Sequence, residues 1–198
     1  MYLSPYHDPF TAGKHYHIYN RAHGYERLFH SHDNYAFFLR RYLHFISPFT
    51  QTFCYCLMPN HYHFLIQVRT LESLNEKDFI QDELPRTNEE IQKRLNENFR
   101  RFQISYSKAL NKQLGRKGGL FMHNYCRKEI NDPSYMNQLV VYIHNNPVNA
   151  GLCNDPANWK YSSYNEILEN DSNIIKPKTT MELFSGFDNF LDMHLLKK

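Results

Sequence analysis

The chain has 198 residues and a formal net charge of +3, from 23 lysine and arginine residues against 20 aspartate and glutamate residues. This length suits one domain that buries a core, and a second full domain is not expected. Aromatic residues make up 16% of the chain and glycine occurs only 7 times, so the composition excludes a disordered chain, while the small positive charge favours polyanionic partners only weakly.

The first predicted strand covers residues 15–23, where side chains alternate between the two sides of an extended chain. Tyr16 and Ile18 lie on one side, and His15 and His17 lie on the other. The two histidines form a His-x-His pair. We expect them to be surface residues of the strand, because no later residue repeats a partner ligand for them. The alternative is that they flank a second His-x-His pair farther along.

A helix and a hairpin follow the first strand. Residues 33–46 place apolar side chains at helical spacing, with Ser31 or Asp33 available as the N-cap. Residues 52–57 and 61–68 then alternate as strands and are joined by a short Met-Pro-Asn turn. Strand, turn and strand together predict a β-hairpin.

The second His-x-His pair, His61 and His63, begins the second arm of this hairpin. In a strand both imidazoles project the same way, whereas Tyr62 between them projects to the other side. Two imidazoles on one face can bind one metal ion. The alternatives are two ordinary polar residues on a solvated strand face, or a zinc site shared with Cys54 and Cys56, whose spacing is unusual for structural zinc.

The longest predicted helix covers residues 88–112 and has one apolar stripe and a basic opposite face. It leads into a glycine-rich basic loop, residues 111–119, that suits phosphate contact. Residues 69–87 have no clear period and predict an irregular insertion or a mobile flap. A solvated polar face is the alternative for the basic residues. The candidate DNA phosphate contacts are Arg100, Arg101, Arg116, Lys117, Arg127 and Lys128.

A loosely alternating strand over residues 120–130 leads into a predicted helix over residues 134–146. Tyr142 and Asn146 are four residues apart and therefore share one face of that helix. Pro147 is expected to end it, because the residue before a proline is disfavoured in the helical region. From the pattern alone, the alternative is that Tyr142 is a core tyrosine and Asn146 a helix-end residue.

The predicted order of elements is strand, helix, strand, strand, helix, strand, helix. This order favours an α+β fold in which helices pack on an antiparallel sheet with ferredoxin-like topology. Residues 1–165 are predicted to form the domain, with residues 69–87 as an insertion. A weaker amphipathic helix over residues 180–196 belongs to a C-terminal extension, residues 166–198, that we expect to pack on the domain.

The sequence contains no run of about 18 apolar residues, and no basic segment followed by an apolar one lies near its start. We therefore expect no membrane span and no signal peptide, and a cytoplasmic protein. The four cysteines lack a Cys-x-x-Cys pair and the density of a disulfide scaffold, so we expect reduced thiols. They are Cys54, Cys56, Cys126 and Cys153.

Four ordered blocks of the sequence resemble the single-tyrosine HUH transposases, in particular the branch of REP-associated tyrosine transposases. The resemblance spans about residues 15–165. The blocks are Met-Pro-Asn-His-Tyr-His-Phe-Leu-Ile at 58–66, Tyr-Ser-Lys at 106–108 with Gly-Arg-Lys-Gly-Gly-Leu-Phe from 115, Tyr-Ile-His-Asn-Asn-Pro-Val-Asn-Ala-Gly-Leu at 142–152, and Trp-Lys-Tyr-Ser-Ser-Tyr at 159–164.

This resemblance implies cleavage and rejoining of single-stranded or hairpin DNA through a 5′-phosphotyrosine intermediate. It implies Tyr142 as the nucleophile, His61 and His63 as metal ligands, and Asn146 as the third protein ligand, where the best-known insertion-sequence members carry glutamine. The expected cofactor is Mg²⁺ or Mn²⁺, since imidazole suits manganese better than magnesium. Some relatives act as homodimers and others as monomers.

Two other functions compete with strand transfer. The first is a non-catalytic single-stranded nucleic-acid-binding protein on the same fold, which would need neither the two histidines nor Tyr142. The second is a ferredoxin-like RNA-binding module that reads single strands through aromatic residues of its sheet, without metal. Covalent attachment of DNA in the presence of Mn²⁺ would distinguish strand transfer from both.

Overall fold

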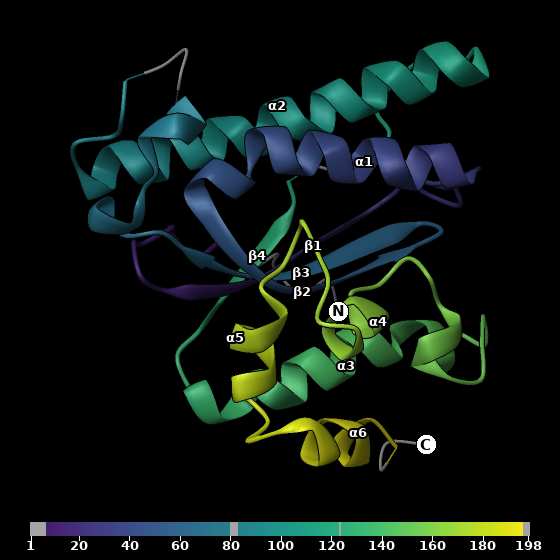
Figure 1. The fold of residues 1–198 in the computed structure, drawn as a ribbon. Coiled ribbons are helices and arrows are strands. Elements are labelled where there is room, and N and C mark those ends of the chain that lie inside the picture. Colours follow the sequence, from purple (N-terminus) through teal and green to yellow (C-terminus); the bar gives the residue numbers. More distant parts are fainter. Residues whose placement is uncertain (1–6, 80–82, 123, 196–198) are drawn as a thin grey trace.

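The centre of the computed structural model, which describes residues 7–79, 83–122 and 124–195, is an antiparallel sheet with helices on both faces (Figure 1). Its strands lie in the order β2-β3-β1-β4. They are β1 (His15–Arg21), β2 (Thr50–Met58), β3 (His61–Val68) and β4 (Cys126–Ile130). With one helix after β1 and one after β3, this is the ferredoxin-like arrangement, which confirms the predicted α+β fold.

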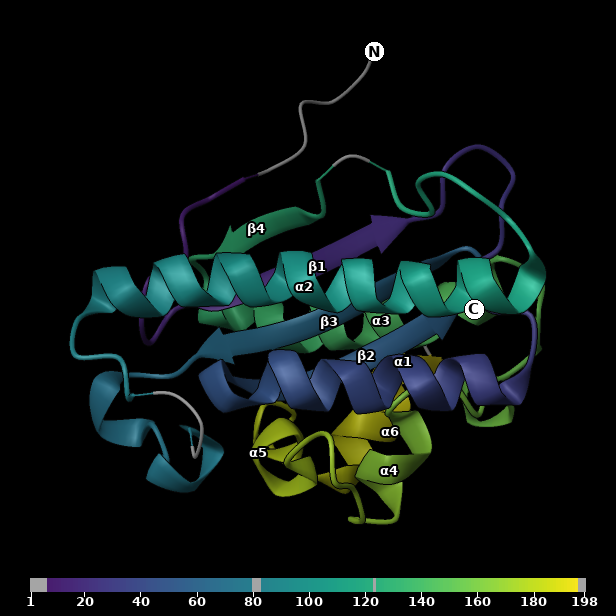
Figure 2. The same cartoon turned by 90° about the horizontal axis from the view of Figure 1, so that it is seen from above.

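Helices α1 (His32–Phe45) and α2 (Asn88–Leu114) lie side by side on one face of the sheet (Figure 2). Tyr42 of α1 stacks on Phe64 of β3, with ring centroids 4.1 Å apart, and Phe102 of α2 meets Tyr42 edge-on at 6.1 Å. The aromatic residues thus fill the layer between these helices and the sheet. Both helices match their predicted bounds to within two residues.

The opposite face of the sheet is covered by helices α3 (Met136–Asn149) and α5 (Pro177–Glu182). Helix α4 (Tyr164–Leu168) packs against α5, and α6 (Phe187–Leu195) lies behind α3, away from the sheet (Figure 1). The prediction of a single helix over residues 180–196 is wrong, because two helices occupy this segment. Residue 196 lies outside the described part. The helix is interrupted at Ser185 and Gly186, because their positive φ angles of 57° and 128° do not occur in a right-handed helix.

Pro147 does not end α3, contrary to the prediction, because the helix continues to Asn149. A proline has no amide hydrogen, so the carbonyl of Ile143 loses its helical donor. The side-chain amide of Asn146 compensates by donating to the carbonyls of Tyr142, at 2.8 Å, and of Ile143, at 3.4 Å. The helix therefore tolerates the proline in its last turn.

Residues 120–130, predicted as one strand, contain the shorter β4 at their end. The chain before β4 runs antiparallel beside the end of β1, where Phe121 makes an isolated bridge with Ala22, and residue 123 lies outside the described part. In the segment predicted as an insertion, residues 69–79 and 83–87 contain no strand, and residues 80–82 are likewise not described. Its short 3₁₀ helices are Leu71–Ser73 and Glu76–Phe79.

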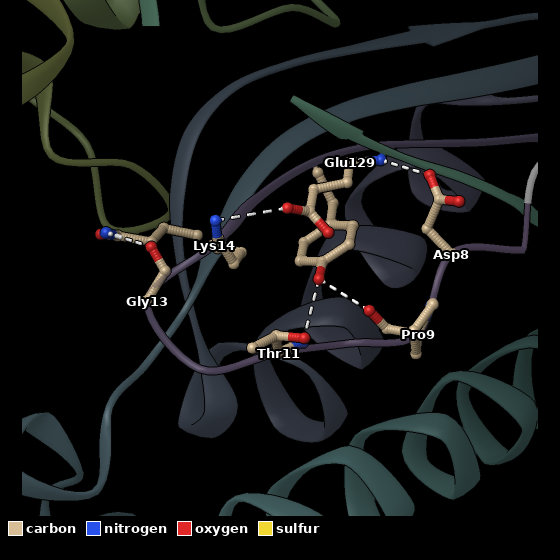
Figure 3. A network of polar contacts seen from close by, with 8 residues as sticks. Asp8, Pro9, Thr11, Gly13, Lys14 and Glu129 are labelled. Carbon is tan, nitrogen blue, oxygen red and sulfur yellow. Dashed lines mark hydrogen bonds and ion pairs between the residues drawn. The ribbon is translucent and has the colours of Figure 1, made fainter. Parts of the chain in front are cut away.

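The N-terminal segment lies along the outer edge of β4. The amide of Glu129 donates to the Asp8 carboxylate at 2.8 Å, and Lys14 forms an ion pair with Glu129 at 3.5 Å (Figure 3). The hydroxyl of Tyr16 in β1 donates to the carbonyl of Pro9 at 2.7 Å. These contacts hold the segment against the sheet.

The outer edge of β2 also has hydrogen-bond partners. The amide of Leu57 donates to the carbonyl of Tyr161 at 2.9 Å, and the amide of Ser163 donates to the carbonyl of Tyr55 at 3.0 Å. The segment before α4 therefore runs beside β2 and satisfies backbone groups that would otherwise face solvent.

Among the described residues, no helix has both the length and the apolar character needed to cross a membrane.

Candidate metal and tyrosine site

The start of β3 presents His61 and His63 to the face of the sheet that α3 covers. Their ring centroids are 5.1 Å apart, and Tyr62 between them is fully buried on the opposite face, where its hydroxyl accepts a hydrogen bond from Gln103 of α2. This is the arrangement expected from the two-residue period of a strand. His63 is buried, whereas His61 remains half-buried at the end of the strand.

Helix α3 brings Tyr142 and Asn146 to the same place. The Tyr142 ring stands edge-on to the His63 ring, with centroids 5.9 Å apart, and its side chain is 43% exposed. The side chain of Asn146 lies beside the His61 ring. One chain therefore brings together all four residues that the sequence singled out for metal binding and nucleophilic attack.

His17 is the residue that sequence reasoning placed wrongly. Its Nε2 lies 2.9 Å from Nδ1 of His63, and the two rings stack with centroids 5.1 Å apart. His17 flanks the site, which agrees with the alternative interpretation of the first His-x-His pair. His15 lies at the start of β1, where its ring contacts Phe53. The predicted topology could have placed His17 near His63, because β1 and β3 are neighbours in a ferredoxin-like sheet. In the structure, Tyr19 of β1 pairs with His63.

The imidazoles of the site are held in their neutral form. Burial lowers the pKa of His17 to about 4, and the positive charge of Lys128 adds to this effect. Burial also lowers the pKa of His63 well below its usual range, with further contributions from His17 and His61. The pKa of His61 is lowered by burial and by the positive charge of Arg21, while the polar side chain of Asn146 acts in the opposite direction. Neutral imidazoles retain the lone pair that a metal ligand needs.

Hydrogen bonds occupy one polar atom of each proposed ligand side chain and leave the other atom to bind a cation. Nδ1 of His61 lies 2.7 Å from the amide oxygen of Asn60 and so carries the proton, which leaves Nε2 as the lone-pair nitrogen. Nδ1 of His63 lies 2.9 Å from Nε2 of His17, and either nitrogen can be the donor, so this contact occupies Nδ1 without fixing its proton. The amide nitrogen of Asn146 is used by its own helix, which leaves the oxygen. Two nitrogens and one oxygen suit a divalent cation.

No Cys₂His₂ zinc site forms among the described residues. In the described ranges, no group of three or more His, Cys, Asp or Glu residues is arranged to hold a metal ion. Cys54 and Cys56 are fully buried, and burial raises the pKa of both thiols, so they stay protonated. The thiols of Cys54, Cys56, Cys126 and Cys153 are free, as predicted.

The basic residues predicted to contact DNA do not form one patch. Arg100 and Arg127 line a hollow between α2 and β4, whereas the Arg101 guanidinium lies over the Phe45 ring at 5.4 Å, on the other side of α2. Arg116 forms an ion pair with Glu26 at 2.7 Å, which fixes the loop after α2. The remaining two candidates, both exposed, are Lys117 and Lys128.

Helix α3 is anchored from behind by α6. His144 is fully buried, with Nδ1 at 3.0 Å from Nε2 of His194 and Nε2 at 2.8 Å from the hydroxyl of Ser163. His194 in turn meets the carbonyl of Phe190 at 2.7 Å. This chain of hydrogen bonds links the C-terminal extension to the helix that carries Tyr142.

Replacing His144 with alanine should lower the free energy of unfolding by about 2–4 kcal/mol, because it leaves a cavity and removes partners from two buried polar groups. Urea unfolding measures this effect. His30→Ala, which removes an exposed histidine, should change stability by less than about 0.5 kcal/mol. Equal stabilities of the two variants would contradict the anchoring role of His144.

Comparison with known proteins bears on the fold. No protein-family model and no curated protein matches the sequence. Among solved structures, the chain is similar to a REP-associated tyrosine transposase bound to a REP hairpin, with a TM-score of 0.60 and 12% sequence identity. The match covers 84% of this chain and 86% of that chain. The chain therefore shares its fold with a tyrosine transposase over most of the length of both proteins.

Proposed function

We propose that this protein is a metal-dependent DNA strand transferase that cleaves and rejoins single-stranded, hairpin-bearing DNA. The observation that carries the proposal is the meeting of His61, His63, Asn146 and Tyr142 in one chain, with the tyrosine accessible to a substrate. A protein that only binds nucleic acid needs neither neutral paired imidazoles nor an exposed tyrosine beside them. The fold shared with a transposase bound to a DNA hairpin supports the same substrate class.

In this proposal, His61, His63 and the Asn146 oxygen would hold Mg²⁺ or Mn²⁺. When bound, such a cation polarises the nonbridging oxygens of a phosphodiester. Tyr142 loses its phenol proton to solvent and its oxygen attacks phosphorus. The bond from phosphorus to the 3′ oxygen breaks, and the departing strand leaves with a 3′ hydroxyl while the 5′ phosphate stays on Tyr142. Attack by a second 3′ hydroxyl reverses the step and joins strands without ATP.

The test uses a pool of DNA hairpins with randomised unpaired flanks, incubated with the protein and Mn²⁺. A label at the 3′ end should migrate with the protein on an SDS gel, because the 5′ phosphate is attached to tyrosine, whereas a label at the 5′ end should leave on a shorter free strand. EDTA should abolish both products, and added Mn²⁺ should restore them. Binding that persists in EDTA, with no adduct under any condition, would support the non-catalytic alternative instead.

His17 is expected to act as a positioning residue through its contact with His63. Replacing it with leucine should weaken Mn²⁺ affinity by about 10–100-fold, as loss of a hydrogen-bond partner of a metal ligand does. The measurement is the Mn²⁺ concentration that gives half-maximal adduct formation. The maximal rate at saturating Mn²⁺ should change much less than this concentration. A lower maximal rate with unchanged Mn²⁺ dependence would contradict the role.

A further inference from the structure

Helix α3, which carries Tyr142 and Asn146, lies between the sheet and α6 (Figure 1). His144 lies midway between these two residues in the sequence and is fully buried, whereas Tyr142 is 43% exposed. A helix turns by about 100° per residue, so a side chain two positions away projects from nearly the opposite side. His144 therefore contacts the elements behind the helix, while Tyr142 and Asn146 face the site in front of it.

The hydrogen bonds behind α3 run in one direction, which the Phe190 carbonyl fixes. A carbonyl only accepts, so Nδ1 of His194, 2.7 Å from this oxygen, carries a proton. Burial lowers the pKa of His144 well below its usual range, so this imidazole is neutral. With both imidazoles neutral, Nδ1 of His144 donates to Nε2 of His194 at 3.0 Å. Nε2 of His144 then accepts from the hydroxyl of Ser163 at 2.8 Å.

The same chain of hydrogen bonds reaches the outer strand of the sheet through Ser163. The amide of Tyr55 in β2 donates to the hydroxyl oxygen of Ser163 at 2.9 Å, and the amide of Ser163 donates to the Tyr55 carbonyl at 3.0 Å. At the other end, the Phe190 ring packs on the ring of His194, with centroids 4.3 Å apart. His144 is thus linked on one side to the backbone of a strand and on the other side to the backbone of α6.

Rotation of α3 about its own axis would move Tyr142 and Asn146 together. The Tyr142 ring meets the rings of His63 and His17 edge-on, with centroids 5.9 and 6.2 Å apart. Ring contacts of this kind tolerate a range of geometries, whereas a hydrogen bond weakens steeply as its angle departs from linear. The hydrogen bonds of His144 therefore restrict this rotation more than the contacts of Tyr142 do. A displacement of about 1 Å at a reacting group can slow a reaction about 100-fold.

We propose that His194 is a positioning residue of the strand transferase. Through its hydrogen bond to His144 it fixes the rotation of α3. That rotation places the Tyr142 oxygen for attack and the Asn146 side chain beside His61. This inference rests on the proposed function and makes α6 of the C-terminal extension a working part of the site.

The test compares two substitutions of His194. His194→Phe keeps a ring but removes both nitrogens, whereas His194→Gln supplies an amide oxygen that can accept the hydrogen bond from His144. At saturating Mn²⁺, His194→Phe should slow single-turnover adduct formation by about 10–100-fold and leave hairpin affinity within about twofold of wild type. His194→Gln should retain most of the wild-type rate. A residue that only fills the core would give the reverse order, because phenylalanine preserves apolar packing and glutamine does not.

Thr180→Val is the matched control. It removes a buried hydrogen bond of the same extension, from the Thr180 hydroxyl to the Phe53 carbonyl at 2.6 Å, which runs to β2 and not to α3. It should form adduct at the wild-type rate at a temperature where circular dichroism shows every variant folded. A wild-type rate in His194→Phe, or an equal loss in His194→Phe and Thr180→Val, would overturn the inference while wild-type adduct leaves the proposed function intact.

A second readout, which needs no activity, is the fluorine NMR spectrum of protein labelled with fluorotyrosine. Tyr142→Phe identifies the Tyr142 resonance by its loss. This resonance should shift in His194→Phe and keep its wild-type position in His194→Gln and Thr180→Val. An unshifted resonance in His194→Phe would contradict the positioning role. If the wild-type protein forms no adduct, the proposed function fails, and the resonance alone decides whether His194 positions α3.

Discussion

Replacing Tyr142 with phenylalanine should abolish the covalent protein–DNA adduct and slow cleavage by at least about 10³-fold, because the attacking oxygen is removed. Hairpin binding should stay within about twofold of wild type. The substitution deletes one hydroxyl from a side chain that is 43% exposed and keeps the ring that contacts His63 and His17. The measurement is adduct formation at saturating Mn²⁺, with binding measured separately by fluorescence anisotropy.

Tyr135→Phe is the matched control for this variant. Tyr135 is also 43% exposed and lies at the start of the same helix, so it tests loss of an exposed hydroxyl without loss of the proposed nucleophile. It should form adduct at the wild-type rate. An adduct that survives in Tyr142→Phe would disprove the assignment. It would direct attention to Tyr19, whose ring centroid lies 5.7 Å from that of His63.

Replacing His61 with alanine should lower the rate of adduct formation by at least about 100-fold at a low Mn²⁺ concentration, because one of two imidazole ligands is lost. His61 is the better choice for this test, since it is half-buried whereas His63 is 6% exposed and its removal would leave a cavity. Raising Mn²⁺ should restore part of the rate. The measurement is the Mn²⁺ dependence of the single-turnover rate.

His15→Ala provides the corresponding control. His15 also lies in a strand, belongs to a His-x-His pair and faces the same side of the sheet, but it pairs with Gln67, at the other end of β3 from His61. Its removal should leave the Mn²⁺ dependence unchanged. If both histidine variants lose activity equally, the loss reflects the sheet and not the metal site, and the proposed ligand set is wrong.

The fold followed from the sequence because its signals are local. Alternation in residues 61–68 and the apolar stripe of residues 88–112 each reflect a repeat that the backbone geometry imposes, and the order of elements then restricts the topology to few choices. The position of His63 relative to Tyr142 could be expected only once β3 and α3 were placed on the same face of the sheet. The family resemblance supplied that step in advance.

The errors have two physical causes, one local and one non-local. Pro147 is predicted to stop α3, yet the side chain of the preceding Asn146 donates to carbonyls of the same helix turn and replaces the missing donor. His17 is predicted to be a surface residue because no later residue repeats a partner ligand for it, yet its ring lies against His63, 46 residues away in the sequence. The hollow beside Arg127 has no sequence signature either, since its walls come from α2 and from an irregular segment. The place of His17 and the hollow both depend on how separate elements pack, which the spacing of residues along the chain does not encode.

The covered edges of the sheet restrict how two copies of this chain can associate. Backbone groups of Tyr55 and Leu57 in β2 are already bonded to the segment before α4, and that of Glu129 in β4 is bonded to Asp8. Among the described residues, neither edge presents the open row of amides and carbonyls that continuation of a sheet across an interface requires. A homodimer would therefore have to form through helices and side chains, and the same shielding protects the sheet from edge-to-edge aggregation.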